Sequence, residues 1–364
     1  MKVGILGGGQ LARMIALAGY PLGLEFIILD PGNDAGAVGL GEHLHGDYND
    51  RALLAELAEK ADVVTYEFEN VPADVAAFLA DHTKVYPAPN ALAISQDRLH
   101  EKEFFHKLGI PTVHYAAISS LEDLQQAMES IGYPAILKSR RMGYDGKGQV
   151  VLKSADQLAE AWKSVEGVDC VVEGFVNFQR EVSIIAVRRP NGEVVFYPLS
   201  ENVHNKGILR VAECGVDDKM QHQAETYAVK LLEALDYVGV VALELFDVNG
   251  EFVANEFAPR VHNSGHWTIE GAETSQFENH LRAILDLPLG LTEARGYTGM
   301  VNFIGGLPTT ESVLDIPYVH HHLYAKSPRK GRKVAHATVR SDSKEKYTQS
   351  LERLVNLAKS TDNS

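Results

Sequence analysis

The sequence predicts an α/β domain followed by two α+β domains, at residues 1–100, 101–178 and 179–364. The first hundred residues alternate short apolar strands with helices, the pattern of a parallel sheet covered by helices. A smaller unit with a different rhythm follows, and after residue 180 the predicted strands lengthen. A chain of 364 residues is long enough for two or three such cores.

The predicted elements follow apolar periodicity and local stop signals. Pro72 suits the first turn of a helix, where its missing N–H has no partner to lose. Gly109 and Pro111 end another helix. Ser154 and Gln157 form a possible capping box. Strands are predicted at 2–6, 25–30, 62–67, 84–87, 134–139, 149–152, 170–174, 181–188, 194–198, 238–247, 252–257, 298–304, 319–324 and 333–339; helices are predicted at 10–18, 51–60, 72–80, 95–108, 119–131, 154–165, 219–235, 274–285 and 343–357.

Composition excludes several classes of protein. The net charge of −15 argues against general affinity for nucleic acid or anionic membranes, so an anionic ligand needs a local basic pocket. Two cysteines, Cys170 and Cys214, exclude a disulfide framework and offer no metal-binding spacing. No stretch approaches the roughly 18 apolar residues of a membrane span, and the N-terminus reads as a strand rather than a signal peptide. We expect a cytoplasmic protein.

A glycine-rich turn joins the first strand to the first helix. Gly7, Gly9 and Ala12 fit the pattern G-x-G-x-x-G/A, and Asp30 ends the next strand. Such glycines let backbone N–H groups approach a phosphate at the positive end of a helix. Nicotinamide dehydrogenases share this pattern, but any phosphorylated ligand could use the turn. We expect it to hold the phosphate of the substrate.

Two further segments could bind a nucleotide. Lys138 ends a strand and precedes a glycine-bearing loop that can fold over a polyphosphate; no Ser or Thr follows Lys147, so the loop is not a P-loop. An ordinary hairpin is the alternative. Residues 173–176, Glu-Gly-Phe-Val, could bond an adenine through the backbone, and Glu181 could bond ribose hydroxyls. By themselves these residues are more typical of a strand end with surface glutamates.

Two glutamates lie on adjacent apolar strands. Glu244 and Glu256 flank the turn residues 248–250, and a buried carboxylate among apolar neighbours needs a cation. A two-residue turn would place them on opposite faces, whereas a three-residue loop with Gly250 left-handed would place them on one face. We predict the three-residue loop and a Mg²⁺ site. The alternative is a pair of solvent-facing glutamates.

Two polar segments follow the second glutamate. Residues 259–268 carry Arg, His, Asn and Ser side chains, which suit a polar anionic substrate. A basic cluster in an acidic protein suits a substrate phosphate better than nucleic acid. Its members are Lys326, Arg329, Lys330, Arg332, Lys333 and His336.

Taken in order, these segments resemble the ATP-grasp superfamily and, within it, the 5-(carboxyamino)imidazole ribonucleotide synthetase family. The matching segments span nearly the whole chain: GILGGGQLARM at 4–14, TYEFENV at 65–71, YDGKGQ at 144–149, ENVHNKGIL at 201–209, NEFAPRVHNSGHWT at 255–268 and KSPRKGRKVAH at 326–336.

The resemblance implies an ATP-grasp fold with a Rossmann-like preATP-grasp domain, a small ATP-lid domain and a C-terminal domain with a mixed sheet. It implies ATP- and bicarbonate-dependent carboxylation of the exocyclic amine of 5-aminoimidazole ribonucleotide in purine biosynthesis. Carboxyphosphate, or CO₂ released from it, would meet the amine. The resemblance also implies two Mg²⁺ ions on Glu244 and Glu256, a homodimer, and neither NAD nor biotin.

The same resemblance implies the site residues. The ATP site comprises Arg98, Lys138, Gly143, Tyr144, Asp145, Gly146, Lys147, Gly148, Gln149, Glu173, Gly174, Phe175, Val176, Glu181, His204, Asn255 and Glu256. The ribotide site comprises Gly9, Gln10, Leu11, Glu67, Tyr144, Lys147, Arg260, His262, Asn263, Ser264, Lys326, Arg329 and Arg332. The residues expected to act in catalysis are Asp145, Tyr144, Lys138, Arg260 and Lys326, with Asp145 as proton acceptor or orienting group.

Other functions remain open from the sequence. Another ATP-grasp ligase, such as a formyl-transferring purine enzyme or a biotin carboxylase, would share most ATP-binding features. A nicotinamide oxidoreductase would use the glycine turn and Asp30 but would leave the acidic pair and the basic cluster without a role. A nucleotide sensor without catalytic activity need not keep the lysine, the acidic pair and the glycine-bearing loop together.

Overall fold

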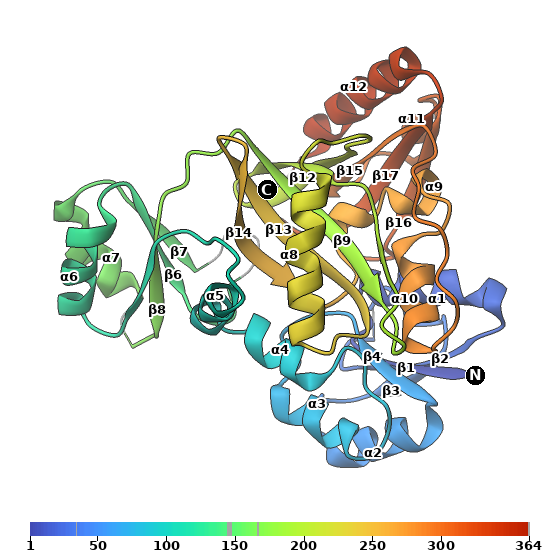
Figure 1. Ribbon diagram of the computed structural model, residues 1–364. Coiled ribbons are helices and arrows are strands. Elements are labelled where there is room, and N and C mark those ends of the chain that lie inside the picture. The colour runs from blue at the N-terminus through green and yellow to red at the C-terminus, as the bar shows by residue number, and fades with distance from the viewer. Residues whose placement is uncertain (34, 144–147, 166, 363–364) are drawn as a thin grey trace.

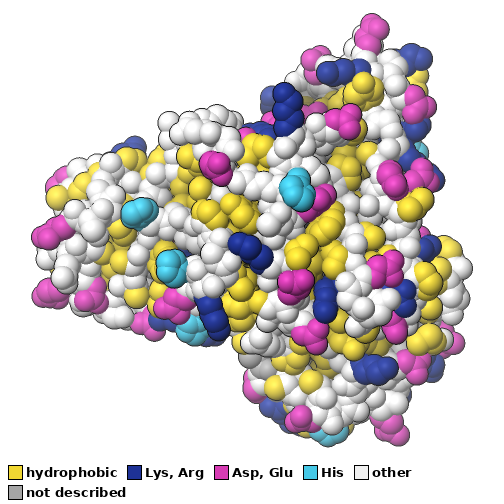
Figure 2. Space-filling model, in the orientation of Figure 1, with side chains coloured by type: hydrophobic (Ala, Val, Ile, Leu, Met, Phe, Trp, Pro, Cys, Tyr) yellow, Lys and Arg dark blue, Asp and Glu magenta, His cyan; other side chains and the backbone are white. Residues whose placement is uncertain are grey.

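The computed structural model describes residues 1–33, 35–143, 148–165 and 167–362. Among these residues three sheets form, and Figure 1 shows the small sheet in a lobe that projects from the rest. On the face seen in Figure 2, acidic and basic side chains are interspersed. Of the described helices, none combines the length and apolar character needed to cross a lipid bilayer.

The N-terminal sheet is parallel, as predicted. Its strands β1 (Lys2–Leu6), β2 (Glu25–Asp30), β3 (Glu42–His45) and β4 (Val63–Tyr66) lie in the order β3-β2-β1-β4. Helices α1 (Gln10–Gly19), α2 (Arg51–Lys60) and α3 (Ala73–Ala80) accompany them, with the short η1 (Tyr20–Leu22). The predicted strand at 84–87 is reduced to one bridge between Val64 and Val85. The glycine turn follows β1 and Glu67 follows the neighbouring strand β4, so the turn and Glu67 lie side by side.

The predicted helix at 95–108 is α5 (Arg98–Lys107), and a separate helix that was not predicted, α4 (Pro89–Ser95), precedes it. Asp97 separates them because its carboxylate caps α5 by accepting from the Leu99 N–H. The same carboxylate binds Arg140, with Nε at 2.9 Å, so the start of α5 is tied to the loop after β6 (Ala135–Ser139).

The small sheet is antiparallel, with the order β5-β8-β6-β7, and completes the projecting lobe. It pairs β6 with β7 (Gln149–Leu152) and β8 (Cys170–Gly174), and β8 with β5 (Tyr115–Ile118). Helices α6 (Leu121–Ile131) and α7 (Leu158–Ser164) share its apolar core. The predicted helix at 154–165 begins as the 3₁₀ turn η2 (Ala155–Gln157). Ser154 makes no capping bond, so the predicted capping box is wrong.

The large C-terminal sheet is antiparallel in every described strand pair, so the prediction of a mixed sheet is wrong. Several strands that are adjacent in sequence form hairpins, while helices lie between others. The strands are β9 (Arg180–Arg188), β10 (Val194–Phe196), β11 (Ser200–Asn205), β12 (Ile208–Cys214), β13 (Gly239–Val248), β14 (Glu251–Ala258), β15 (Tyr297–Ile304), β16 (Val319–Leu323) and β17 (Lys333–Ser341). The helices are α8 (Gln221–Ala234), η3 (Asn263–Gly265), α9 (Thr268–Gly271), α10 (Gln276–Ile284), α11 (Thr310–Leu314) and α12 (Lys344–Thr361).

Apolar packing joins the first domain to the large sheet. Ile15 of α1 and Phe26 of β2 belong to the same buried cluster as Val240 of β13 and Leu281 of α10. Burial of such side chains contributes about 25 cal/mol per Å² of apolar surface. This shared core holds the glycine turn against the C-terminal segments that follow β14. The limits proposed for the three domains stay a prediction.

The turn between β13 and β14 has two residues, so the predicted three-residue loop is wrong. Val248 pairs with Glu251, and Asn249 (φ 56°) and Gly250 (φ 83°) form the turn. Both residues are left-handed, as in the Asn-Gly turns that match the twist of a hairpin.

A β-bulge nevertheless places Glu244 and Glu256 on one face. Leu245 pairs with Ala254, but Glu244 pairs with Glu256, so Asn255 is an extra residue in β14. The bulge reverses the alternation set by the turn. The predicted apposition of the two glutamates is therefore confirmed, although the predicted cause is not.

Replacing Gly250 by Ala should lower the free energy of unfolding by about 1–2 kcal/mol, because a left-handed conformation brings Cβ close to the following carbonyl oxygen. No atom lies within 4 Å of the added Cβ, so packing adds nothing to the effect. Urea unfolding measures it. The control Asn249→Gly keeps left-handed freedom and should change stability by less than half as much. Equal effects would contradict the turn assignment.

Candidate active site

A cleft of about 740 Å³ lies between the N-terminal sheet, the start of α5 and the large sheet. It brings together many of the residues predicted for the two binding sites: Gln10, Leu11, Glu67, Arg98, Gly143, His204, Glu244, Glu256, Arg260, His262, Asn263, Lys326, Arg329 and Arg332.

Three backbone N–H groups at the glycine turn and the start of α1 are bound by carboxylates of the chain. The Gly8 N–H donates to the Asp30 carboxylate at 2.7 Å, and the N–H groups of Gly9 and Ala12 donate to the Glu67 carboxylate. Burial raises the pKa of Glu67, although the two amides and Lys326 oppose this. These carboxylates occupy the amides of Gly8, Gly9 and Ala12, and a contact of the turn with the substrate phosphate stays a prediction.

The basic segment begins beside this turn, at Lys326. Lys326, Arg329 and Arg332 line the cleft, and the Lys326 ammonium donates to the side-chain oxygen of Gln10. Burial lowers the pKa of Lys326, and the Glu67 carboxylate opposes the shift. The prediction that His336 belongs to this cluster is wrong, because its side chain is fully buried and does not line the cleft.

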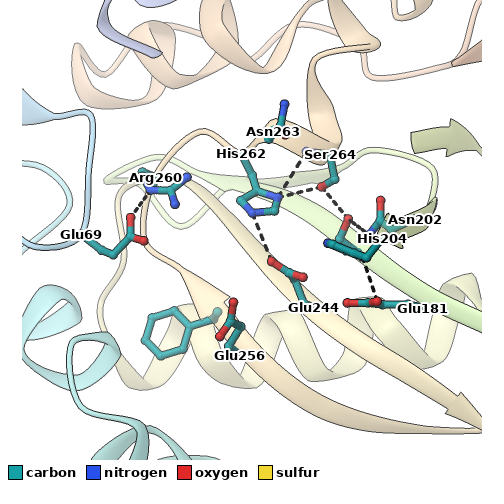
Figure 3. A network of polar contacts seen from close by, with 12 residues as sticks. Glu69, Glu181, Asn202, His204, Glu244, Glu256, Arg260, His262, Asn263 and Ser264 are labelled. Atoms are coloured by element: carbon teal, nitrogen blue, oxygen red, sulfur yellow. Dashed lines mark hydrogen bonds and ion pairs between the residues drawn. The ribbon is translucent and has the colours of Figure 1, made fainter. Parts of the chain in front are cut away.

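Each of the opposed carboxylates has a side-chain partner. His262 Nε2 lies 3.1 Å from Glu244 Oε1 (Figure 3), and Arg98 donates to Glu256 Oε2 at 2.9 Å. Glu244 is only 7% exposed; burial opposes its ionisation, but His262, His204 and Arg260 hold its pKa at about 2. The alternative of two solvent-facing glutamates does not hold for Glu244, whereas the Glu256 side chain is 39% exposed. A second bond from Arg98 reaches the Gly143 carbonyl, where the glycine-bearing loop begins.

A second group of cation ligands lies next to Glu244. Among the described residues, Glu181, His204 and Glu244 each offer one ligand atom within 4.8 Å of the others. His204 Nδ1 lies 2.9 Å from Glu181 Oε2 (Figure 3). An imidazole with two carboxylates suits transition metals, whereas Mg²⁺ prefers oxygen ligands alone. The pair Glu244 and Glu256 therefore fits Mg²⁺ better.

Lys138 belongs to a buried charge cluster. Its ammonium lies 2.6 Å from Glu173 Oε2, and Lys102 lies 3.1 Å from Glu173 Oε1. Lys102 also donates to the Asn255 carbonyl at 3.2 Å, which links the cluster to the bulge. Burial lowers the pKa of Lys138. Two cations facing one carboxylate leave an excess of positive charge that suits a phosphate.

The polar loop after β14 is anchored on both sides. Arg260 forms an ion pair with Glu69 of the first domain. His262 Nδ1 lies 2.8 Å from Ser264 Oγ, which in turn accepts from Ser183 at 2.6 Å. Ser264 is fully buried, so its hydroxyl holds the His262 imidazole from beneath the wall of the cleft.

Some predicted residues do not line the cleft. Gly148, Gln149, Gly174, Phe175 and Val176 lie in the small lobe, where Phe175 is 52% exposed. Tyr144, Asp145, Gly146 and Lys147 lie outside the described residues.

Sequence reasoning missed Glu101 and Lys102. With Arg98 they occupy one face of α5 at spacings of three and four residues, which is the signal that could have identified them. Glu101 is 2% exposed and accepts from the Phe257 N–H at 2.8 Å. Burial and the neighbouring Glu256 raise the pKa of Glu101 to about 8.

The chain matches three protein families in sequence order. The ribonucleotide synthetase preATP-grasp domain matches residues 1–96, the ATP-grasp domain 103–277 and the phosphoribosylaminoimidazole carboxylase C-terminal domain 298–350. The N5-carboxyaminoimidazole ribonucleotide synthase of Pseudomonas aeruginosa is 52% identical over 340 residues, covering 93% of this chain and 94% of the relative. The chain belongs to the N5-carboxyaminoimidazole ribonucleotide synthase family. The fold and the ligase activity expected from the resemblance are thereby confirmed.

Solved structures of N5-carboxyaminoimidazole ribonucleotide synthases have the same fold as this chain. The synthetase from Thermus thermophilus is 51% identical, with a TM-score of 0.94 and 98% of both chains covered. The synthase from Aspergillus clavatus in complex with ADP and 5-aminoimidazole ribonucleotide is 32% identical, with a TM-score of 0.91 and 98% of both chains covered. Members of this family are ATP-dependent ligases of purine biosynthesis, and this chain is one of them.

Glu101 should make stability depend on pH. Because its pKa rises from 4.5 to about 8 on folding, the stabilisation from the bound proton is complete below pH 4.5 and is lost as the pH rises through 8. The loss is at most about 1.4 kcal/mol per pH unit. Glu101→Gln keeps the acceptor for the Phe257 N–H but removes the titration.

Urea unfolding in EDTA at pH 5.5 and 8.5 tests this expectation. The wild type should lose more stability between the two pH values than Glu101→Gln does. Glu103→Gln, an exposed change on the same helix, is the control and should follow the wild type. An equal loss in wild type and Glu101→Gln would contradict the assignment.

Proposed function

We propose that this cleft carboxylates the exocyclic amine of 5-aminoimidazole ribonucleotide, with ATP and bicarbonate as co-substrates. The observation that carries the proposal is the composition of one cleft. Two opposed carboxylates, Glu244 and Glu256, share it with a basic segment that begins at Lys326. The Aspergillus clavatus relative, in complex with ADP and 5-aminoimidazole ribonucleotide, supports the same pair of ligands for this chain.

On the ATP side, Lys138 is proposed to bind phosphate as a point charge, leaving Glu173 when the nucleotide arrives. Arg98 is placed to bind phosphate at the boundary between Glu256 and Gly143. Glu181 and His204 would receive the ribose hydroxyls. The remaining residues of the small lobe that are predicted to bind ATP would cover the adenine base.

Glu244 and Glu256 are proposed to hold Mg²⁺, with two ions in the complete site. Directly opposed residues of a hairpin have Cβ atoms about 4.5–5.5 Å apart, which lets two carboxylates share a cation. When bound, Mg²⁺ would neutralise charge on the β- and γ-phosphates. Arg98 and His262 hold the carboxylates in place until then.

On the ribotide side, Lys326, Arg329 and Arg332 are proposed to bind the phosphate of the ribotide. The carboxylates at the glycine turn would repel that phosphate, so Glu67 and Gln10 are left to contact the neutral part of the substrate. Arg260, His262 and Asn263 would complete the wall, and Tyr144 and Lys147 are proposed to contact the ribotide as well.

The reaction is proposed to proceed in two steps. A bicarbonate oxygen attacks the γ-phosphorus, the bond to the bridging oxygen breaks, and ADP leaves carboxyphosphate behind. The amine nitrogen then attacks the carboxyl carbon, or CO₂ released from it, while inorganic phosphate leaves. Asp145 would accept the proton that the nitrogen loses, and Arg260 and Lys326 would stabilise the developing negative charge. A homodimer and a cytoplasmic location complete the proposal and rest on family membership and composition.

The direct test is ADP release with Mg-ATP and bicarbonate, with and without 5-aminoimidazole ribonucleotide. The ribotide should stimulate release strongly, and EDTA should abolish it. ADP release indifferent to the ribotide would overturn the substrate assignment.

Asp145→Asn should retain nucleotide binding but lower turnover by roughly 10²–10⁴-fold, the range of general acid–base contributions. Titration with ADP checks binding, and steady-state assays check turnover. Asp156→Asn, an exposed change in the small lobe, is the control. Near-normal turnover of Asp145→Asn would remove the assignment.

A further inference from the structure

A buried tyrosine–histidine cluster lies behind the ribotide-binding segments. Tyr324 is 1% exposed, and His266 and His336 are fully buried. The Tyr324 hydroxyl lies 2.8 Å from His336 Nδ1 and 3.3 Å from His266 Nδ1. No role in the proposed reaction uses these groups, yet the hydroxyl joins elements that are far apart in the sequence.

The cluster reaches the cleft through Asn263. Asn263 Nδ2 lies 3.0 Å from His266 Nδ1, and its amide exchanges two hydrogen bonds with Asn302, at 2.7 and 3.1 Å. Figure 3 shows the Asn263 side chain turned away from Glu244 and Glu256. Its position at the wall of the cleft is therefore set by groups behind that wall.

The cluster also reaches the cleft through the backbone. Tyr324 lies two residues before Lys326, and Ala325 between them is left-handed, with φ 54°. This conformation costs a non-glycine residue about 1–2 kcal/mol. It sends the Tyr324 side chain into the core and leaves Lys326 lining the cleft.

Neighbouring groups support the cluster. The imidazoles of His322 and His336 stack with centroids 4.4 Å apart, and His322 Nε2 lies 2.8 Å from Glu270 Oε1. A Cβ on Gly36 would collide with the Tyr324 carbonyl oxygen, so the backbone there is tightly enclosed. Burial lowers the pKa of His266 and of His336 well below 6.5, so both are neutral and each carries a single N–H.

We propose that Tyr324 is a positioning residue whose hydroxyl, through His266 and His336, fixes Asn263 and Lys326 relative to each other for the ribotide. This inference rests on the proposed function, because the two segments that Tyr324 aligns are the ones proposed to bind the ribotide. Loss of the hydroxyl should let the Lys326 segment and the Asn263 loop move independently while the nucleotide side stays intact.

Tyr324→Phe removes the hydroxyl and keeps the ring. It should raise the KM for the ribotide about tenfold and leave the KM for ATP within twofold of the wild type. Tyr347→Phe is the matched control: its hydroxyl donates to Glu213 at 2.7 Å, it is 7% exposed, and it lies on α12 outside the cleft. This control should change neither KM.

Ala325→Gly is a second variant that separates positioning from stability. Glycine relieves the left-handed strain, so the thermal midpoint should stay or rise, whereas the KM for the ribotide should rise because the link to Lys326 loosens. A purely structural role predicts no rise in that KM.

The outcomes distinguish a failure of the proposed function from a failure of the positioning role. If the wild type shows no ribotide-stimulated ADP release, the proposed function fails. If the wild type is stimulated and Tyr324→Phe keeps a normal KM for the ribotide, the positioning role fails. The positioning role also fails if Tyr324→Phe raises both KM values equally, because a general loss of structure would do the same.

Discussion

The apposition of Glu244 and Glu256 is the constraint on which the rest of the site depends. One extra residue, Asn255, turns the second carboxylate to the face that the first one occupies. The bulge also carries the carbonyl that Lys102 binds, so the charge cluster of the small lobe is anchored to the same irregularity. A regular hairpin with the same turn would separate the carboxylates and leave one of them facing the apolar core.

The charged groups of the cleft hold one another in place before any ligand is bound. Lys138 pairs with Glu173, Arg98 with Glu256, His262 with Glu244 and Arg260 with Glu69. Each pair offsets the cost of burying an isolated charge. A ligand therefore exchanges one ionic partner for another and need not supply the whole cost of desolvation.

Much of the fold was predictable because apolar periodicity is strong where strands are fully buried, as at 2–6 and 170–174. Strand β11 was missed because its residues are largely polar and partly exposed, whereas β12 is mostly apolar and buried and could have been predicted. Many site residues were predictable from their motifs. The bulge could not be predicted, since one extra residue leaves no trace in composition. The hydrogen bond from Gly9 to Glu67 could not be predicted either, because the two residues are 58 positions apart.

The capped glycine turn has a consequence for how the cleft attracts a ligand. In a dinucleotide enzyme the same turn is the positive end of a helix and attracts an anion. Here the Asp30 and Glu67 carboxylates take the place of that anion at Gly8, Gly9 and Ala12, and the Lys326 ammonium stands beside them at Gln10. The chain itself thus offsets much of the positive end of the helix. The attraction for an incoming anion has to come from the lysine and arginine side chains that line the cleft, and these can be replaced one by one without disturbing the helix.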